Sequence, residues 1–286
     1  MPSIAILLFM AIAALLAGLA GSYLGIGGGI FLVPVMALII RVPIKEAIAT
    51  SLIGVIATSS GAASVYVRDH LTNLRLAMFL EVATTLGAIG GAIVGLLVSP
   101  VFLYVAFGAM VLYAAATMVI RQETAKDRVY RAGSESPVAE RLRLGSVYFD
   151  REDQGVYRYR VDHPLAGFAV SAAAGGFSGL LGVGGGFIKV PAMNVLMHVP
   201  MKAAVTTSNF MVGVTAAASA FIYFSQGFVN PSLAAMVIIG VFTGTHIGTR
   251  LLERARAARV RIIFAILLII LGVAMAARVV GFGAVL

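Results

Sequence analysis

The sequence predicts an all-α polytopic membrane protein built from two inverted-topology repeats. Its composition, its apolar segments and a duplicated glycine-rich motif support this prediction. The chain is 60% hydrophobic and 12% charged, with a mean hydropathy of +1.00. Soluble domains are about 45–50% apolar and about 25% charged. The composition therefore indicates an integral membrane protein.

The glycine-rich motif occurs twice in one register. "GIGGGIFLVP" occupies residues 25–34, and "GVGGGFIKVP" occupies residues 182–191, 157 positions later. The same offset relates the segments that follow, from Val42-Pro43 and Val199-Pro200 as far as Gly91 and Gly248. Chance does not hold one register over such a length, so the chain contains an internal duplication.

Apolar segments of about 20 residues, the length that spans a bilayer, define the predicted helices. They cover about 3–24, 46–67, 76–98, 101–120, 164–181, 203–225, 231–249 and 262–281. Two more, Ile30–Ile40 and Phe187–Met197, have about half that length. The first segment lacks the basic residues that open a signal peptide, and its copy begins near Leu165. We therefore expect a retained helix and eight to ten membrane segments.

Basic residues in the short loops predict the orientation, because they favour the cytoplasmic side. They mark the loop with Arg68 and Arg75, the polar stretch 121–163, and the arginine-rich junction 250–261. With these on one side, the helix at 46–67 enters the cytoplasm and its copy at 203–225 leaves it. The repeats 1–120 and 164–286 are therefore expected to be inverted relative to each other.

Residues 121–163 form the one sizeable polar stretch between the repeats. "SVYFD" and "VYRYRV" surround the turn-rich "REDQG", and this alternation with aromatic residues predicts a small β-hairpin. Its acidic and basic residues are nearly balanced. We expect a solvated cytoplasmic linker, and a regulatory role is the alternative.

The composition excludes several functional classes. The net charge of +9 does not indicate nucleic-acid binding, because the basic residues lie in short loops between apolar segments. The chain has no cysteine, which rules out disulfides and thiol chemistry, and no histidines are spaced as metal ligands. The glycine motif lacks the strand that a dinucleotide site requires. No cofactor or metal is expected.

The consecutive glycines predict breaks in two membrane helices. Such glycines destabilise a helix and leave backbone groups unpaired, which is tolerated in a membrane only inside protein or beside water. Helix breaks at matching positions of inverted halves indicate a transporter binding site, and the freed N–H groups suit an anion. The candidate residues are Gly25, Gly27, Gly28, Gly29, Gly182, Gly184, Gly185 and Gly186.

Polar side chains within the predicted spans extend this candidate site. Hydroxyl and amide groups at equivalent depths suit an oxyanion, although serine and threonine also bond their own helix backbone. Lys189, opposite Leu32 in the other repeat, is a further candidate for substrate contact because of its intramembrane charge, with a side chain that extends to the membrane surface as the alternative. Glu81 and His246 are candidates for proton coupling, with a structural role near the cytoplasmic ends as the alternative. The hydroxyl and amide candidates are Thr50, Ser51, Thr206, Thr207, Ser208 and Asn209.

The doubled "GxGGG…VP" motif, with the sequels "KEAIATS" and "KAAVTTSN", resembles the TauE/SafE family of sulfite exporters. The family motif falls on the eight glycines above and on Pro34 and Pro191. The resemblance implies transport of sulfite or a related sulfur-containing oxyanion or organosulfonate across the bacterial inner membrane, usually outward.

We therefore expect a secondary transporter that works by alternating access around the two glycine breaks. An anion channel would share this site, and a membrane sensor or assembly protein would act through the linker. An enzyme is disfavoured, because Lys189, Glu81 and His246 have apolar equivalents in the other repeat. The sequence leaves open the substrate, the direction, the coupling ion and the oligomeric state.

Overall fold

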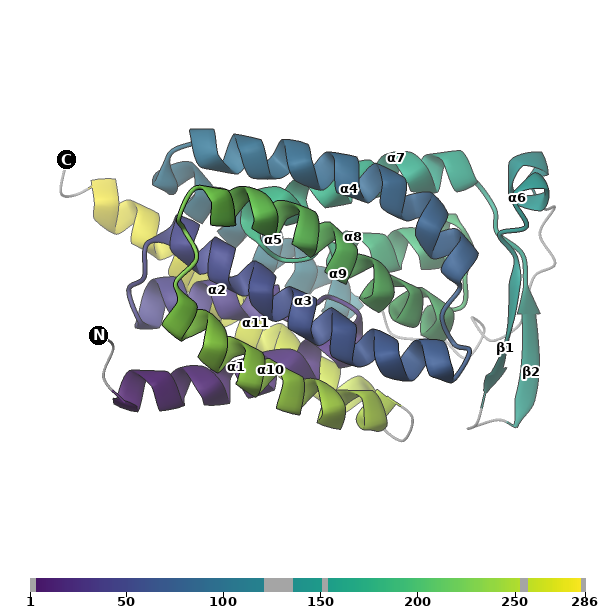
Figure 1. Cartoon of the computed structure of the whole chain (residues 1–286), viewed down its shortest axis with the longest axis horizontal. Coiled ribbons are helices and arrows are strands. Elements are labelled where there is room, and N and C mark those ends of the chain that lie inside the picture. Colours follow the sequence, from purple (N-terminus) through teal and green to yellow (C-terminus); the bar gives the residue numbers. More distant parts are fainter. Residues whose placement is uncertain (1–3, 121–135, 151–153, 253–256, 284–286) are drawn as a thin grey trace.

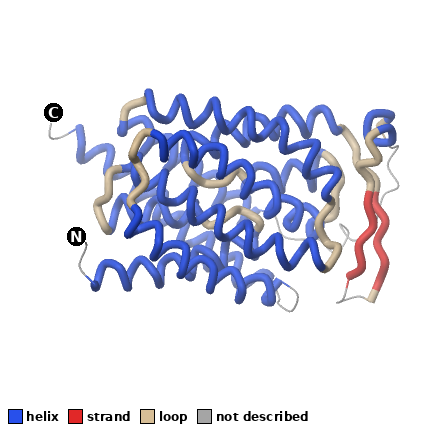
Figure 2. The backbone as a smooth tube through the Cα atoms, in the orientation of Figure 1, coloured by secondary structure: helices blue, strands red, loops and turns tan. Residues whose placement is uncertain are grey.

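The computed structural model describes residues 4–120, 136–150, 154–252 and 257–283 as a bundle of helices with a small β-hairpin at one end (Figures 1 and 2). Its long helices match the predicted segments in order. They are α1 (Ile4–Leu24), α3 (Ile44–Arg68), α4 (Leu74–Leu97), α5 (Pro100–Ile120), α7 (Pro164–Leu181), α9 (Met201–Ser225), α10 (Pro231–Leu252) and α11 (Ala257–Gly283).

Six of the described helices, α3, α4, α5, α7, α9 and α10, are long and apolar enough to cross a membrane. Large apolar side chains lie on the outside of the bundle, among them Leu97 at 80%, Phe221 at 74% and Leu86 at 68% exposure. Such a surface suits contact with lipid and not with water. The chain is a multi-pass membrane protein.

Two short helices fill the half-length segments. Helix α2 (Gly29–Pro34) continues into the π-helix η1 (Val35–Ile39), and α8 (Gly186–Pro191) continues into η3 (Ala192–Leu196). In both, the widening to a π-helix follows the proline, which has no N–H for the α-helical bond.

Each short helix turns back along the long helix before it. Gly28 at the tip packs against the carbonyl of Ala17 in α1, and the small residue Gly18 follows Ala17. In the second half, Gly167 in the first turn of α7 packs against Met197, the residue after η3. The chain thus forms two helical hairpins, α1–α2 and α7–α8, whose tips are the glycine motifs.

The two halves pack against each other in an exchanged arrangement. Helix α1 packs against α10, and its equivalent α7 packs against α4. Glycine contacts repeat with the same offset: Gly18 meets the backbone of Val241, and Gly175 meets that of Thr84. Helices α1 and α7 run in opposite directions in Figure 1. This arrangement agrees with the predicted inversion, whose sense in the membrane stays a prediction.

The linker contains the predicted hairpin. Strands β1 (Ser146–Asp150) and β2 (Gly155–Tyr159) pair antiparallel after the short helix α6 (Pro137–Arg141). Tyr148 and Tyr159 are buried in a cluster with Leu71 and Met197 of the membrane helix ends. Part of the linker thus docks on both halves of the bundle, while Val147, Phe149 and Val156 are exposed. The expectation of a solvated linker stays a prediction.

Asn73 fastens the linker to the first repeat. Its side chain accepts from the N–H of Leu76 at 3.1 Å and so caps α4. Its Nδ2 donates to the carbonyl of Leu144 at 2.7 Å and to the hydroxyl of Tyr159 at 3.1 Å. Burial raises the pKa of Tyr159 to about 12, so this hydroxyl stays neutral at physiological pH.

We predict that Gly91→Ala destabilises the protein by about 1–3 kcal/mol, the usual effect of overpacking. A Cβ at Gly91 would strike the carbonyl of Gly176 on α7, whereas a Cβ at neighbouring Gly90 would meet nothing within 4 Å. Gly90→Ala is therefore the matched control and should be neutral or slightly stabilising. Thermal unfolding in detergent measures both, and equal shifts would contradict the packing of α4 on α7.

We also predict that Asn73→Ser destabilises the linker. Serine still caps a helix but loses both bonds to the linker, which together contribute about 1–3 kcal/mol. The control is Asn230→Ser, because Asn230 caps α10 through the N–H of Leu233 at 3.3 Å. Limited proteolysis should cut the linker faster in the Asn73 variant alone. Equal cleavage of both variants would show that Asn73 does not hold the linker.

Candidate functional site

The two glycine tips meet inside the bundle. A Cβ on Gly29 would strike the carbonyl of Gly182, and a Cβ on its equivalent Gly186 would strike the carbonyl of Gly25. Both motifs, residues 25–29 and 182–186, are buried throughout. The structure therefore brings together the two helix breaks that the sequence places 157 positions apart.

Glycine is required in these tips by backbone conformation as well as by space. Gly27 and Gly28 have φ of +84° and +75°, and Gly184 and Gly185 have φ of +79° and +71°. Residues with a Cβ rarely adopt such angles. The chain thus reverses direction sharply, and α2 and α8 begin at once behind it.

Two serines clasp the tips across the halves. Ser51 of α3 donates to the carbonyl of Gly182 at 2.8 Å, and its equivalent Ser208 of α9 donates to the carbonyl of Gly25 at 2.9 Å. Each hydroxyl satisfies a carbonyl that the helix break leaves without a helical partner. The sequence predicted these serines as site residues but not which atoms they would contact.

The N-terminal ends of α2 and α8 face this junction without a side-chain cap. Gly28 and Gly185 are the N-cap residues, and neither end receives a side-chain hydrogen bond. Val55 of α3 and Val212 of α9 both pack where a Cβ on Gly27 would lie, their Cγ1 atoms 3.2 and 2.6 Å away. The tips touch, and valine methyl groups cover them, so this conformation is closed.

The other hydroxyl and amide candidates lie around the clasp in mixed roles. Thr206 donates to the carbonyl of Leu71 at 2.9 Å. Thr207 accepts from the N–H of Asn73 at 3.1 Å. These two fasten α9 to the loop before α4.

Three buried polar atoms on α3, α7 and α9, the helices that contact the tips, have no hydrogen-bond partner among the described residues. They are Thr50 Oγ1, Asn209 Oδ1 and Ser178 Oγ. The Nδ2 of Asn209 donates to the carbonyl of Ser22 at 2.8 Å, so only its oxygen is unpaired. Ser178 of α7 lies 3.3 Å from where a Cβ on Gly185 would be. Sequence reasoning missed Ser178, because its equivalent is Gly21 and no repeated polar position marks it.

Lys189 and Glu81 come together through one threonine. Lys189 of α8 is fully buried, and its Nζ donates to Thr215 Oγ1 of α9 at 3.2 Å. The same hydroxyl donates to Glu81 Oε1 of α4 at 2.7 Å. Glu81 is 8% exposed and also accepts from Thr84 at 2.8 Å and Thr85 at 3.1 Å. A charged pair is thereby held between α4 of the first half and α8 and α9 of the second half.

His246 lies apart from this cluster. It belongs to the exposed residues of α10, whereas Glu81 and Lys189 are buried on α4 and α8. The described residues hold no group of three or more His, Asp or Glu side chains that could bind a metal ion.

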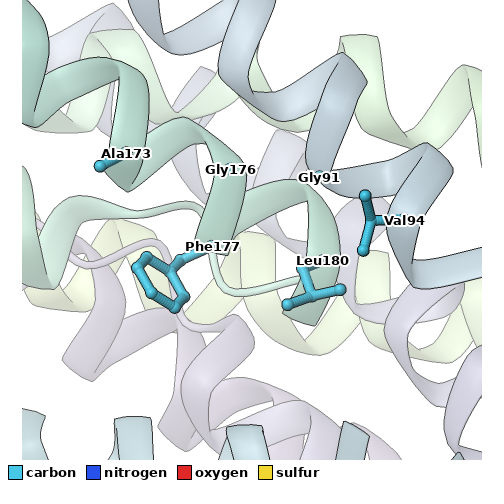
Figure 3. Close-up of a pocket in the computed structure, with 6 residues that line it drawn as sticks. All are labelled: Gly91, Val94, Ala173, Gly176, Phe177 and Leu180. Atoms are coloured by element: carbon cyan, nitrogen blue, oxygen red, sulfur yellow. The ribbon is translucent and has the colours of Figure 1, made fainter. Parts of the chain in front are cut away.

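A separate hollow of about 330 Å³ lies on the surface between α4 and α7 (Figure 3). Its lining is Gly91, Val94, Ala173, Gly176, Phe177 and Leu180. These residues offer no polar side chain, so the hollow does not suit an anion.

Comparison with known proteins agrees with this architecture. The family model "Sulfite exporter TauE/SafE" matches residues 10–275. "Probable membrane transporter protein YunE" of Bacillus subtilis (strain 168) is 27% identical over 90% of this chain and 93% of its own length. A "Probable membrane transporter protein" of Xylella fastidiosa (strain 9a5c) is also 27% identical, over 85% and 84%. No solved structure matches. The chain belongs to the TauE/SafE family of membrane transporters.

Proposed function

We propose that the protein is a secondary transporter for sulfite or a related sulfur-containing oxyanion or organosulfonate in the bacterial inner membrane, working mainly outward. The observation that carries this proposal is the meeting of the two glycine tips within the bundle, each fastened by a serine of the other half. The family description, "Sulfite exporter TauE/SafE", supports the substrate class.

The anion site forms when the tips separate. The first N–H groups of α2 and α8 then face the gap, where uncapped helix ends and glycine backbone favour an oxyanion. The unpaired oxygens of Thr50 and Ser178 belong to hydroxyl groups that can donate to the anion. Lys189 supplies a positive charge from the second half.

Alternating access follows from the exchanged packing. Each half contributes one hairpin tip and one helix, α3 or α9, that clasps the other tip. Rocking of one half against the other would open the junction first to one end of the bundle and then to the other. The closed conformation described above is the occluded state of this cycle.

The purified protein in liposomes should exchange labelled external sulfite for unlabelled internal sulfite. Exchange should be faster than in protein-free liposomes, and unlabelled sulfite on the opposite side should accelerate it. Competition identifies the substrate class: sulfate, thiosulfate and short organosulfonates are added outside, and their inhibition of labelled sulfite exchange is compared. Labelled sulfite that leaves proteoliposomes equally fast without an exchange partner would favour a channel. Flux no faster than in protein-free liposomes would contradict the transport proposal.

The tips must also separate for transport. Because the chain has no cysteine, Val55→Cys together with Val212→Cys places a single thiol pair over the closed tips. Oxidation should join α3 to α9 through a disulfide and reduce the exchange rate at least tenfold. A reductant should restore the rate. The two single variants treated with oxidant are the controls. Full exchange by protein in which the cross-link has formed would show that transport does not require the junction to open.

A further inference from the structure

We propose that Glu81, Thr215 and Lys189 form a proton-coupling unit that makes transport an electroneutral symport of one proton with one monovalent anion. The inference rests on the proposed transport function. The structural observation is a fully buried lysine joined to a nearly buried glutamate through a single threonine hydroxyl.

The geometry leaves Lys189 able to serve a second acceptor. A lysine ammonium carries three donors, and Thr215 is its hydrogen-bond partner among the described residues. Thr215 lies one turn after Val212 on α9, and Val212 packs where a Cβ on Gly184 of the second hairpin tip would lie. The head of Lys189, bonded to Thr215, is therefore held close to this tip. An anion between the separated tips would attract this ammonium.

Glu81 has an environment built for a carboxylate with one countercharge. Three hydroxyls donate to it, from Thr84, Thr85 and Thr215. Helix α7, packed against α4, has no titratable residue between Pro164 and Leu181, and α9 has only Lys202 near its start and Tyr223 near its end. Lys189 is thus the charge that faces Glu81 from the packed elements.

Charge balance then links the anion to a proton. In the empty carrier, the positive Lys189 offsets the negative Glu81. When a bound anion pairs with Lys189, Glu81 is left as a buried carboxylate without a countercharge, which is energetically costly. The carboxylate removes that cost by binding one proton and becoming a neutral carboxylic acid. Release of the anion returns Lys189 to Glu81, which gives up the proton on the same side. Such a symport runs outward when the outward anion gradient exceeds the inward proton gradient, as it does when the anion builds up inside the cell.

The positions that the duplication makes equivalent to these three residues carry no such unit. Leu32 replaces Lys189 and Ile238 replaces Glu81, while Thr58 keeps the hydroxyl of Thr215. Thr58 donates to the carbonyl of Gly54 in its own helix at 2.9 Å. The equivalent set therefore shows the same backbone positions without charge, and Thr58 provides a matched control.

Glu81→Gln is the decisive variant, because glutamine imitates the protonated carboxyl. The loaded carrier should cross the membrane, so exchange of labelled for unlabelled sulfite in liposomes should persist. The empty carrier would hold an uncompensated Lys189 charge and should not return. An acidic exterior should drive accumulation of labelled sulfite and acidify a trapped pH dye in wild type. Both effects should fall to the level of protein-free liposomes in the variant.

Thr215→Val tests the bridge without removing a charge. It should slow the gradient-driven accumulation about tenfold, the effect of losing a hydrogen bond to a charged group. Thr58→Val, the control, should leave the dependence on the pH gradient unchanged. Size-exclusion chromatography and thermal unfolding establish that the variants are folded.

The outcomes separate the two proposals. Wild-type protein without sulfite exchange overturns the transport function and this coupling with it. Wild-type exchange that ignores a pH gradient overturns the coupling alone. Gradient-driven accumulation that persists in Glu81→Gln also overturns it. If Glu81→Gln does not fold, Thr215→Val decides. Gradient-driven accumulation as fast in this variant as in wild type overturns the coupling.

Discussion

The structure depends on the close approach of two glycine tips within the bundle. Neither tip tolerates a Cβ, because each lies against a backbone carbonyl of the other. The broken helices expose backbone groups, which apolar surroundings penalise. Ser51 and Ser208 satisfy one carbonyl on each side. The two halves thus complete each other's hydrogen bonding, and each break is stable only because the other half is present.

The exchanged helix packing follows from the same constraint. To reach the centre, each hairpin must lie among helices of the other half, as α1 does beside α10 and α7 beside α4. Small residues allow this, since Gly87 and Gly244 pack against the carbonyls of Ala172 and Leu15. Helix association in lipid lacks a hydrophobic driving force and depends on such close backbone contact.

The sequence predicted the helices and the two tips, because hydropathy and the doubled glycines report directly on the backbone. It did not predict that Ser51 reaches Gly182, since a side chain's partner depends on how helices cross. For the same reason it did not predict that Glu81 accepts a hydrogen bond from Thr215 of α9. The docking of Tyr159 on Asn73 was hidden because balanced linker charge gives no sign of a buried face.

The contrast between scaffold and charges separates two tasks within one fold. The repeated elements, namely the tips, the clasping serines and the glycine contacts, occur in both halves and would allow either half to rock against the other. The charged elements do not repeat, because Leu32 and Ile238 occupy the positions equivalent to Lys189 and Glu81. A second buried charged pair would add desolvation cost without geometric need. These residues therefore favour a fold in which the repeated backbone permits the motion, and the charged pair, which does not repeat, provides the coupling.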